Sequence, residues 1–290
     1  MQDLAKARAE RWWQTRTHLG RIDRAGRFID DVGFALLFPK KSIELPSLWE
    51  AASDRPLAEV TDWEADDIGR VWRWKDELPL RGLAWYGAFV RGRKSFISPA
   101  LLADLYPRAG GPEDFAEAEL SDDARRIARI LLRSGPQSTA ALREAMDIEG
   151  SRGNERFTRA VGELGRALVV TNFGTSDEGT GWPSAVLELT ARVFSVPRGR
   201  DPERTRRSAT RTYLSTMIHS RPYELGNAFG GGAKSARAAW VDLVAIGEAE
   251  RDGAAYHLRV LGIPGAAAHT VARVRPSPHR GDPPHLRSGP

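Results

Sequence analysis

The sequence contains no cysteine, and this absence excludes disulfide bonds, thiolate metal sites and cysteine nucleophiles. No apolar stretch approaches the roughly 18 residues that a membrane-spanning helix needs. Residues 1–8 also lack the apolar core of a signal peptide. A chain without cysteine fits a reducing compartment. These absences predict a cytoplasmic protein without a membrane partner.

Motifs for common catalytic sites are also missing. Three of the six histidines lie after residue 265, and none has the spacing of a metal-binding HExxH motif. The chain has no P-loop, no GxGxxG and no GxSxG motif. Glu44, Asp76 and Glu77 are carboxylates beside apolar segments, where such groups are usually ion-paired or solvated. We therefore expect no cofactor and no metal, and the enzyme class stays open.

The net charge of +5 is unevenly distributed. Lys and Arg exceed Asp and Glu by 2 in residues 1–111, by 4 in residues 197–265 and by 3 in residues 266–290, whereas residues 112–196 carry a net charge of −4. An anionic partner is suggested by local basic patches rather than by the total charge. The acidic middle region also leaves a protein-interaction role open.

Proline and glycine divide the chain into four regions. Breaks at Pro107–Pro112 and Pro197–Pro202 separate an N-terminal helical domain (1–111) from two further domains (112–196 and 197–265). The C-terminal region (266–290) contains five of the eighteen prolines and almost no large apolar residue, so it is predicted to be a disordered tail.

The second and third regions repeat one order of elements. In each, three helical patterns precede a β-hairpin: Ser121 and Ser138 are predicted N-caps in the second region, and Asp252-Gly253 is a predicted hairpin turn in the third. Three helices followed by a hairpin are typical of a winged helix. We therefore predict a mainly α protein with small β-hairpins (α+β), built from tandem winged-helix modules.

The first region is harder to assign. Residues 61–79 predict a capped helix, residues 83–90 a further helix, and Ser98-Pro99 opens a helix that runs to Leu105. Gly33–Phe38 is a buried run for which periodicity does not decide between helix and strand. A divergent winged helix is an alternative interpretation of this domain.

Exposed cations identify candidate contacts to DNA. The third helix of a winged helix usually enters the major groove, where Arg pairs with guanine and Asn with adenine, and either can hold phosphate. A basic turn and a basic first helix suit phosphate contact. The candidate residues are Arg91, Arg93, Lys94, Arg152, Asn154, Arg156, Arg159, Arg207, Arg211, Lys234 and Arg237. The alternative is that these are ordinary solvated faces.

Several strings resemble the AlkZ-like (YcaQ-type) family of winged-helix DNA glycosylases, and most of all its AlkZ-related branch. They are Phe28–Pro39, Pro46–Ala51, Trp72–Pro79, Trp85-Tyr86 and Ser95–Ser98. The resemblance covers about residues 10–262. It implies a tandem winged-helix protein whose partner is double-stranded, damaged DNA and whose location is the nucleoid. Family enzymes excise bulky alkylated or crosslinked bases without a metal.

The family's Gln-x-Gln motif, which positions the hydrolytic water, is missing here. The chain has three glutamines, Gln2, Gln14 and Gln137, and the matching position reads Phe34-Ala35-Leu36. No catalytic residue can be transferred, so a DNA-binding protein without the usual chemistry is the main hypothesis. An active glycosylase that uses Asp30 or Asp31 is the alternative, and a transcriptional regulator is a further one.

Overall fold

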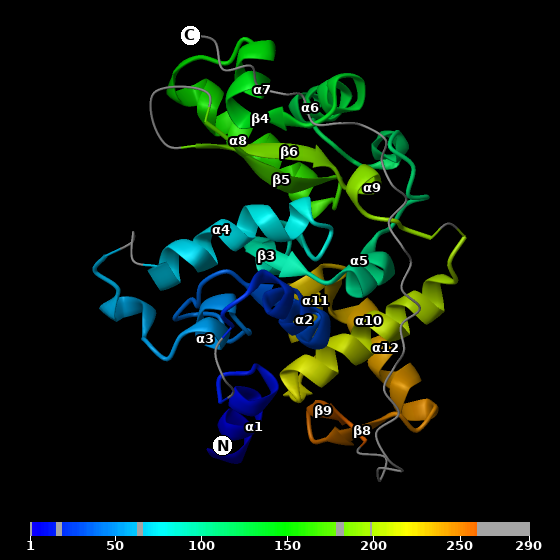
Figure 1. Cartoon of the computed structure of the whole chain (residues 1–290). Coiled ribbons are helices and arrows are strands. Elements are labelled where there is room, and N and C mark those ends of the chain that lie inside the picture. Colours follow the sequence, from blue (N-terminus) through cyan, green and yellow to red (C-terminus); the bar gives the residue numbers. More distant parts are fainter. Residues whose placement is uncertain (1, 16–18, 63–65, 178–182, 198, 260–290) are drawn as a thin grey trace. The chain divides into compact units, whose positions relative to one another are not determined.

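One order of elements occurs three times in the computed structural model: helix, short strand, two helices, two strands. The structure describes residues 2–15, 19–62, 66–177, 183–197 and 199–259. In each repeat the three strands form an antiparallel sheet in which the last strand lies in the middle. We call the repeats modules 1, 2 and 3 (Figure 1). The predicted disordered tail, 266–290, lies outside the described residues.

Module 1 follows the first helix, α1 (Gln2–Arg11). Its elements are α2 (Ile22–Val32), β1 (Phe34–Leu36), α3 (Leu48–Ala52), α4 (Asp66–Leu80), β2 (Trp85–Ala88) and β3 (Lys94–Ile97), with the 3-10 helices η1 (Leu57–Glu59) and η2 (Val90–Gly92) between them. The helix expected over residues 83–90 is wrong, because Trp85–Ala88 pairs with β3 as a strand. Hairpin pairing with β3, the next strand along the chain, has overridden a locally helical pattern.

Gly33 resolves the uncertainty of the run at Gly33–Phe38. Its φ of 77° ends α2 and turns the chain into β1. A Cβ at this position would lie 2.3 Å from the Thr212 methyl carbon, so only glycine permits both the turn and the close approach of α10. The run is therefore a strand, and it is covered from both sides.

Module 2 comprises α6 (Asp122–Ser134), β4 (Gln137–Ser138), α7 (Thr139–Ala145), α8 (Gly150–Arg166), β5 (Val170–Ser176) and β6 (Ser184–Leu189). The helix α5 (Pro99–Leu105) and the 3-10 helix η3 (Asp114–Glu117) precede it, and α9 (Thr190–Val193) follows. The predicted caps are confirmed, since the side chains of Ser98, Ser121 and Ser138 each accept a hydrogen bond from a backbone N–H in the first turn.

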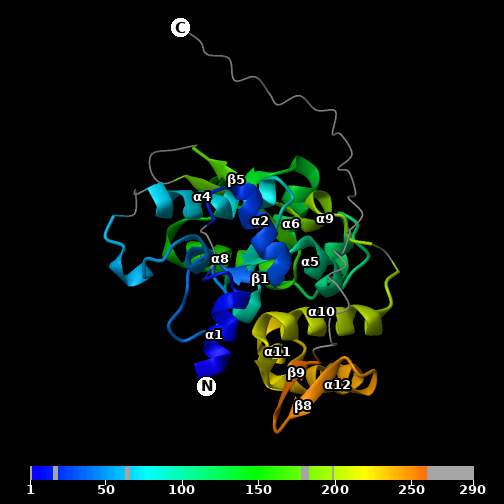
Figure 2. The same ribbon diagram turned by 60° about the horizontal axis from the view of Figure 1, so that its bottom comes forward.

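Module 3 comprises α10 (Pro202–Met217), β7 (His219–Ser220), α11 (Pro222–Phe229), α12 (Gly232–Ala245), β8 (Ala249–Asp252) and β9 (Ala255–Leu258). Figure 2 shows these elements grouped together, with the β8–β9 hairpin beside α12. A hairpin turn is confirmed here, but it lies one residue later than predicted: Asp252 pairs with Ala255 as the last residue of β8, and Gly253, with φ of 59°, and Ala254 make the turn.

The two faces of the first sheet pack against different modules. Ala35, Tyr86 and Phe96 belong to a core with α2 and α4 of the same module. On the other face, the Phe34 ring stacks on Tyr213 of α10 at 5.7 Å and meets Phe229 of α11 edge-on at 5.3 Å. Module 1 and module 3 thus share one apolar core, whereas module 2 has its own.

Module 2 docks on module 1 through β5 and the end of α8. The helix α4 lies along β5, and β2 contacts both β5 and α8. The Thr171 hydroxyl accepts from the Tyr86 backbone N–H at 3.1 Å, and a Cβ on Gly165 would lie 3.0 Å from the Ala88 nitrogen. Residues up to Arg259 therefore form one compact unit.

The fold class is confirmed as mainly helical with small antiparallel sheets. The element order in all three modules is the one that predicted winged helices in the second and third regions. Separation into domains at residues 111 and 196 stays a prediction. Within the described residues, no helix is long and apolar enough to cross a membrane.

Candidate nucleic-acid interface

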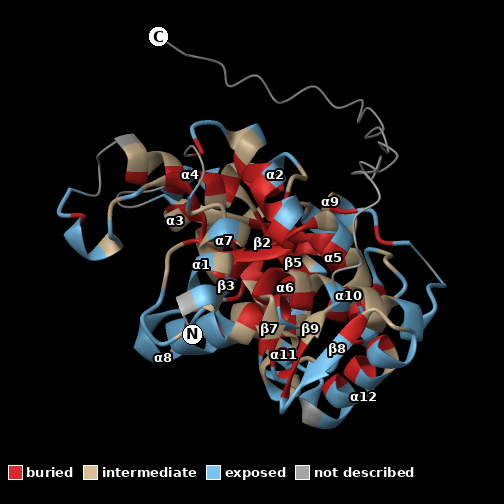
Figure 3. Cartoon of the chain, turned by 90° about the horizontal axis from the view of Figure 1, so that it is seen from below, coloured by how far each residue is buried: buried red, intermediate tan, exposed pale blue. Residues whose placement is uncertain are grey.

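The helix α8 exposes a row of arginines opposite its buried face. Phe157, Ala160 and Leu164 face the core of module 2. The predicted residues Arg152, Asn154, Arg156 and Arg159 are all exposed. Parts of the α8 ribbon are accordingly pale blue in Figure 3.

These side chains differ in what they bind. The Arg156 guanidinium donates to both oxygens of Asp123, at 3.1 and 2.8 Å. Within the described part of the chain, Arg152 and Arg159 have no ion-pair or hydrogen-bond partner, and neither has Arg166. Asn154, Arg159 and Arg166 line one shallow surface depression together with Glu155.

We name Arg152, Arg159 and Arg166 the α8 stripe. Their spacing of seven residues places them one above another on the helix, because seven residues are close to two turns. Arg166 is absent from the residues predicted from the sequence, although its spacing from Arg159 is a visible signal. Glu155 lowers the local charge, whereas Glu163 is engaged elsewhere, accepting from the backbone and side chain of Ser121 at 2.6 Å each.

Module 3 contributes a smaller set of free cations. Lys234 and Arg237 are exposed on the first half of α12 and have no ionic partner among the described residues. Arg211 is less available, because its Nε donates to Glu248 at 2.8 Å. Arg207 is half-buried on α10. Of the four residues predicted here, two are therefore free to meet an anion.

The basic turn of module 1 does not present its three cations together. Arg91 has a left-handed backbone, with φ of 51°, in η2, which packs on α11 of module 3. Arg93 is exposed. The Lys94 ammonium lies 5.7 Å from the centre of the Tyr86 ring. The candidates thus fall into three sets, one on each module, and Figures 1 and 2 show α8 well separated from α12.

The segment that the sequence predicts to match a Gln-x-Gln motif is buried and apolar. Phe34, Ala35 and Leu36 in β1 have exposed fractions of 0%, 1% and 2%, and none has a polar side-chain atom. The packing of Phe34 against Tyr213 and Phe229 fills the space in front of the strand. The side chains of β1 have no group that can orient a water molecule.

The two candidate carboxylates, Asp30 and Asp31, differ in their hydrogen-bond partners. The Asp31 carboxylate accepts from Arg11 at 2.9 Å and from the Trp13 indole at 2.6 Å. Asp30 has no partner within the described residues. Asp30 is an exposed residue of α2, but partial loss of hydration at its carboxyl group raises its pKa to about 6. Asp30 is therefore the one that could carry a proton near neutral pH.

A cluster of polar groups lies where module 1 meets module 2. We name Lys75, Asp76, Tyr86, Lys94 and Asn172 the Lys94 cluster. The Asp76 carboxylate accepts from Lys75 at 2.5 Å and from the Asn172 amide at 2.7 Å. The sequence predicts Asp76 as an ordinary ion-paired group; it is ion-paired, but it is also 8% exposed and joined to a strand of the other module.

Burial shifts the pKa values of this cluster. Desolvation raises the pKa of Asp76, against the opposing effect of the Lys75 hydrogen bond and charge. Desolvation also lowers the pKa of Lys94, and repulsion from Lys75 adds to this effect. Burial and the nearby Asp76 charge raise the pKa of Tyr86. The cluster thus combines one carboxylate with two amines: Lys75 is bonded to that carboxylate, and Lys94 has a lowered pKa.

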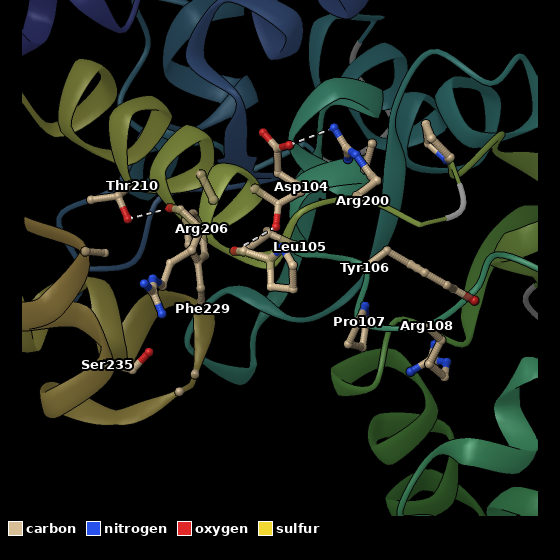
Figure 4. A pocket seen from close by; sticks show the side chains of 18 of the residues that line it. Asp104, Leu105, Tyr106, Pro107, Arg108, Arg200, Arg206, Thr210, Phe229 and Ser235 are labelled. Atoms are coloured by element: carbon tan, nitrogen blue, oxygen red, sulfur yellow. Dashed lines mark hydrogen bonds and ion pairs between the residues drawn. The ribbon is translucent and has the colours of Figure 1, made fainter. Parts of the chain in front are cut away.

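A cavity of about 570 Å³ opens beside α10 and is shown in Figure 4. Its floor includes Leu105 and Phe229. Two of its cations are already paired, since Arg200 binds Asp104 at 3.0 Å and Arg206 binds Asp242 at 3.4 Å. This pairing makes the cavity a weaker phosphate site than the α8 stripe.

Helices and small antiparallel sheets in this order define an AlkZ-like fold. Among solved structures the chain is similar to the Streptomyces sahachiroi DNA glycosylase AlkZ, with a TM-score of 0.51 and 13% identity over 87% of this chain and 67% of that one. The family model described as AlkZ related matches residues 20–223, so the chain belongs to the AlkZ-related family. No curated protein matches.

The residues described hold no group of three or more His, Asp or Glu side chains placed to bind a metal ion.

Proposed function

We propose that the protein binds double-stranded DNA through the α8 stripe, supported by Lys234 and Arg237 on α12 and by Arg93 before β3. The α8 stripe carries the proposal, because three unpaired arginines at helical spacing on the third helix of a module suit contact with a duplex. Membership of a family named after a DNA glycosylase supports damaged DNA as the form that is bound.

Phosphate contact explains why unpaired cations matter more than paired ones. Each cation that neutralises a phosphate releases a condensed counterion, and this release is the main source of sequence-independent affinity. Arg156 must first leave Asp123 before it can contact DNA. The free residues Arg152 and Arg159 have no such cost.

The test is fluorescence anisotropy at low salt with duplex, mismatched and alkylated DNA. We expect wild type to bind, and the double variant Arg152→Glu, Arg159→Glu to bind about 100-fold more weakly, because attraction to two phosphates is replaced by repulsion. The matched control is Arg129→Glu, Arg133→Glu, which makes the same charge change at exposed residues of α6. Absence of wild-type binding, or equal losses for both variants, would overturn the proposal.

We propose further that β1 does not activate water for base excision. Its three side chains are apolar and buried, and hydrolysis of a glycosidic bond needs a polar group to orient or deprotonate the attacking water. A protein of this kind recognises DNA without the chemistry implied by the family's Gln-x-Gln motif.

A second candidate function is base excision that depends on Asp30. The observation in its favour is an unpaired carboxyl whose pKa is raised to about 6, which suits a general acid or base. Alkylated or crosslinked duplex would then acquire abasic sites with wild type and with Asp31→Asn, but not with Asp30→Asn. Abasic sites that persist with Asp30→Asn would rule out this role.

A transcriptional regulator is distinguished by sequence preference. Competition by genomic fragments in the same anisotropy assay separates the two roles, since a regulator binds its site about a thousandfold or more tightly than other DNA. We expect no such preference, because phosphate contacts carry no sequence information.

A further inference from the structure

The Lys94 cluster contains more amines than carboxylates. Asp76 is the carboxylate in contact with an amine of the cluster, and Lys75 holds it at 2.5 Å. The second acceptor position of Asp76 is taken by the Asn172 amide at 2.7 Å. The Lys94 ammonium therefore has no ion-pair partner among the residues described and lies over the face of Tyr86.

Lys94 is accessible to solvent, while its amine packs against the Tyr86 ring. Lys94 opens β3 opposite Ala88, and Ala88 touches Gly165 of α8. Its side chain lies on the sheet face of Tyr86 and α4, yet the residue as a whole is exposed. A partner arriving from solvent can reach the amine without displacing buried side chains.

The surroundings of Lys94 lower the pKa of its amine below the usual value, although the nearby Asp76 charge opposes this shift. A lysine becomes a nucleophile toward carbonyl groups when it is desolvated or lies next to another cation. Lys94 meets both conditions, since packing at Tyr86 removes water and the Lys75 charge repels a second ammonium. Hydration and ion pairing, which keep most surface lysines charged, are both reduced here.

An exposed tryptophan, Trp72, lies against Lys75, the second lysine of the cluster. Trp72 is 44% exposed, and its ring lies 4.8 Å from the Lys75 ammonium. Phe38 stacks on the inner side of this ring at 6.1 Å and fixes its orientation. Exposed rings of this kind stack on nucleobases and fill gaps where a base has left the helix.

We propose that Lys94 captures the aldehyde of an abasic deoxyribose in DNA as a Schiff base. The capture rests on the DNA binding proposed above. Lys94 pairs with Ala88, which touches Gly165 of α8 next to Arg166 of the α8 stripe, so a duplex held by the stripe passes near Lys94. Among the sugars of DNA, the abasic one is the sugar that opens to a free aldehyde.

The atoms of this step balance without a co-reactant. The neutral Lys94 amine attacks the C1′ carbonyl carbon, and a C–N bond forms. Both amine protons leave with the carbonyl oxygen as one water molecule, and a C=N bond remains. Hydrolysis reverses the reaction and returns the amine and the aldehyde. No electrons are gained or lost until a reductant is added in the test.

Reductive trapping tests the capture directly. Wild type is incubated with a duplex that contains one abasic site and with sodium cyanoborohydride, whose hydride reduces the imine to a stable secondary amine. The covalent complex is separated on a denaturing gel. Its yield is divided by the fraction of duplex bound, measured by anisotropy, so that a change in affinity does not mimic a change in chemistry.

We expect wild type to be trapped and Lys94→Arg to lower the trapped yield per bound duplex at least about tenfold, since a guanidinium stays protonated. Lys41→Arg, at an exposed lysine outside the cluster, should stay within about twofold of wild type. Peptide mass mapping of the wild-type adduct should place it on Lys94, which tests the assignment without relying on a variant.

Three results would overturn the proposal: bound wild type that gives no adduct, an adduct that maps to another amine, or a yield that Lys94→Arg does not change. Failure to bind the abasic duplex would overturn the DNA-binding proposal as well, and the anisotropy measurement separates that case from a failure of the chemistry alone.

Discussion

The helices α4 and α8 hold the same place in two modules but face different surroundings. The helix α4 lies along β5 of module 2, and its Asp76 is hydrogen-bonded to Asn172 there. The helix α8 touches module 1 near its C-terminal end, at Gly165, and exposes the α8 stripe. Whether a helix can contact DNA therefore depends on which elements cover it, and not on its position in the repeat.

The largest expected effect is a loss of stability when the contact between α4 and module 2 is removed. Asp76→Ala leaves the Lys75 ammonium and the Asn172 amide without their acceptor, and removal of one partner of a buried pair costs about 3–5 kcal/mol of unfolding free energy. Urea denaturation measures it. Glu77→Ala is the control, with an expected decrease below about 1 kcal/mol, because its pair with Arg81 is partly exposed. Equal decreases would mean that Asp76 does not hold the two modules together.

A smaller effect is expected on DNA affinity when the free cations of α12, rather than those of α8, are replaced. Lys234→Glu with Arg237→Glu should weaken duplex binding by about tenfold, since the change places two negative charges near the phosphates on a helix that has fewer free cations. Anisotropy with the same duplex and the Arg129→Glu, Arg133→Glu control gives the answer. A weakening larger than that of the α8 variant would move the main interface from module 2 to module 3.

The pH dependence of stability tests whether the Asp30 carboxyl group of module 1 is desolvated. The pKa of Asp30 rises from 3.8 to about 6 on folding, so the folded state binds the proton more tightly. The stabilisation is present below pH 3.8 and is lost as the pH rises toward 6. Asp30→Asn should therefore unfold at a higher denaturant concentration than wild type above pH 6, relative to their difference at pH 3.5. A pH-independent difference would contradict the desolvation of Asp30.

The smallest effect concerns Arg156, the paired member of the predicted set on α8. Arg156→Ala should lower the unfolding free energy by less than about 1 kcal/mol, because its pair with Asp123 is partly exposed. Duplex affinity should change by less than about threefold, against about tenfold for Arg159→Ala. A larger effect of Arg156→Ala than of Arg159→Ala would show that the ion pair opens on DNA.

Local signals in the sequence are sufficient for much of the fold. Ser98, Ser121 and Ser138 are recognisable as caps because a cap depends on residues within one turn. The β8–β9 hairpin is visible to within one residue, since Asp-Gly marks a tight turn whose backbone angles glycine adopts easily. These features need no knowledge of the rest of the chain.

The remaining features depend on packing between distant residues. Asp76 meets Asn172 across 96 positions, and Arg156 meets Asp123 across 33. The first contact depends on packing of module 1 against module 2, and the second on packing of α6 against α8 within module 2. No local pattern encodes either contact. The free cations of the α8 stripe can therefore be proposed from the sequence, but not separated from the paired ones.

The salt dependence of duplex binding tests the central claim most directly. For wild type, the logarithm of the association constant should fall linearly with the logarithm of salt concentration. The triple variant Arg152→Gln, Arg159→Gln, Arg166→Gln should reduce the magnitude of this slope by about 2.7, or about 0.9 for each phosphate that is no longer neutralised. Arg73→Gln, at an exposed cation of α4, should leave the slope unchanged. An unchanged slope in the triple variant would contradict DNA binding through α8.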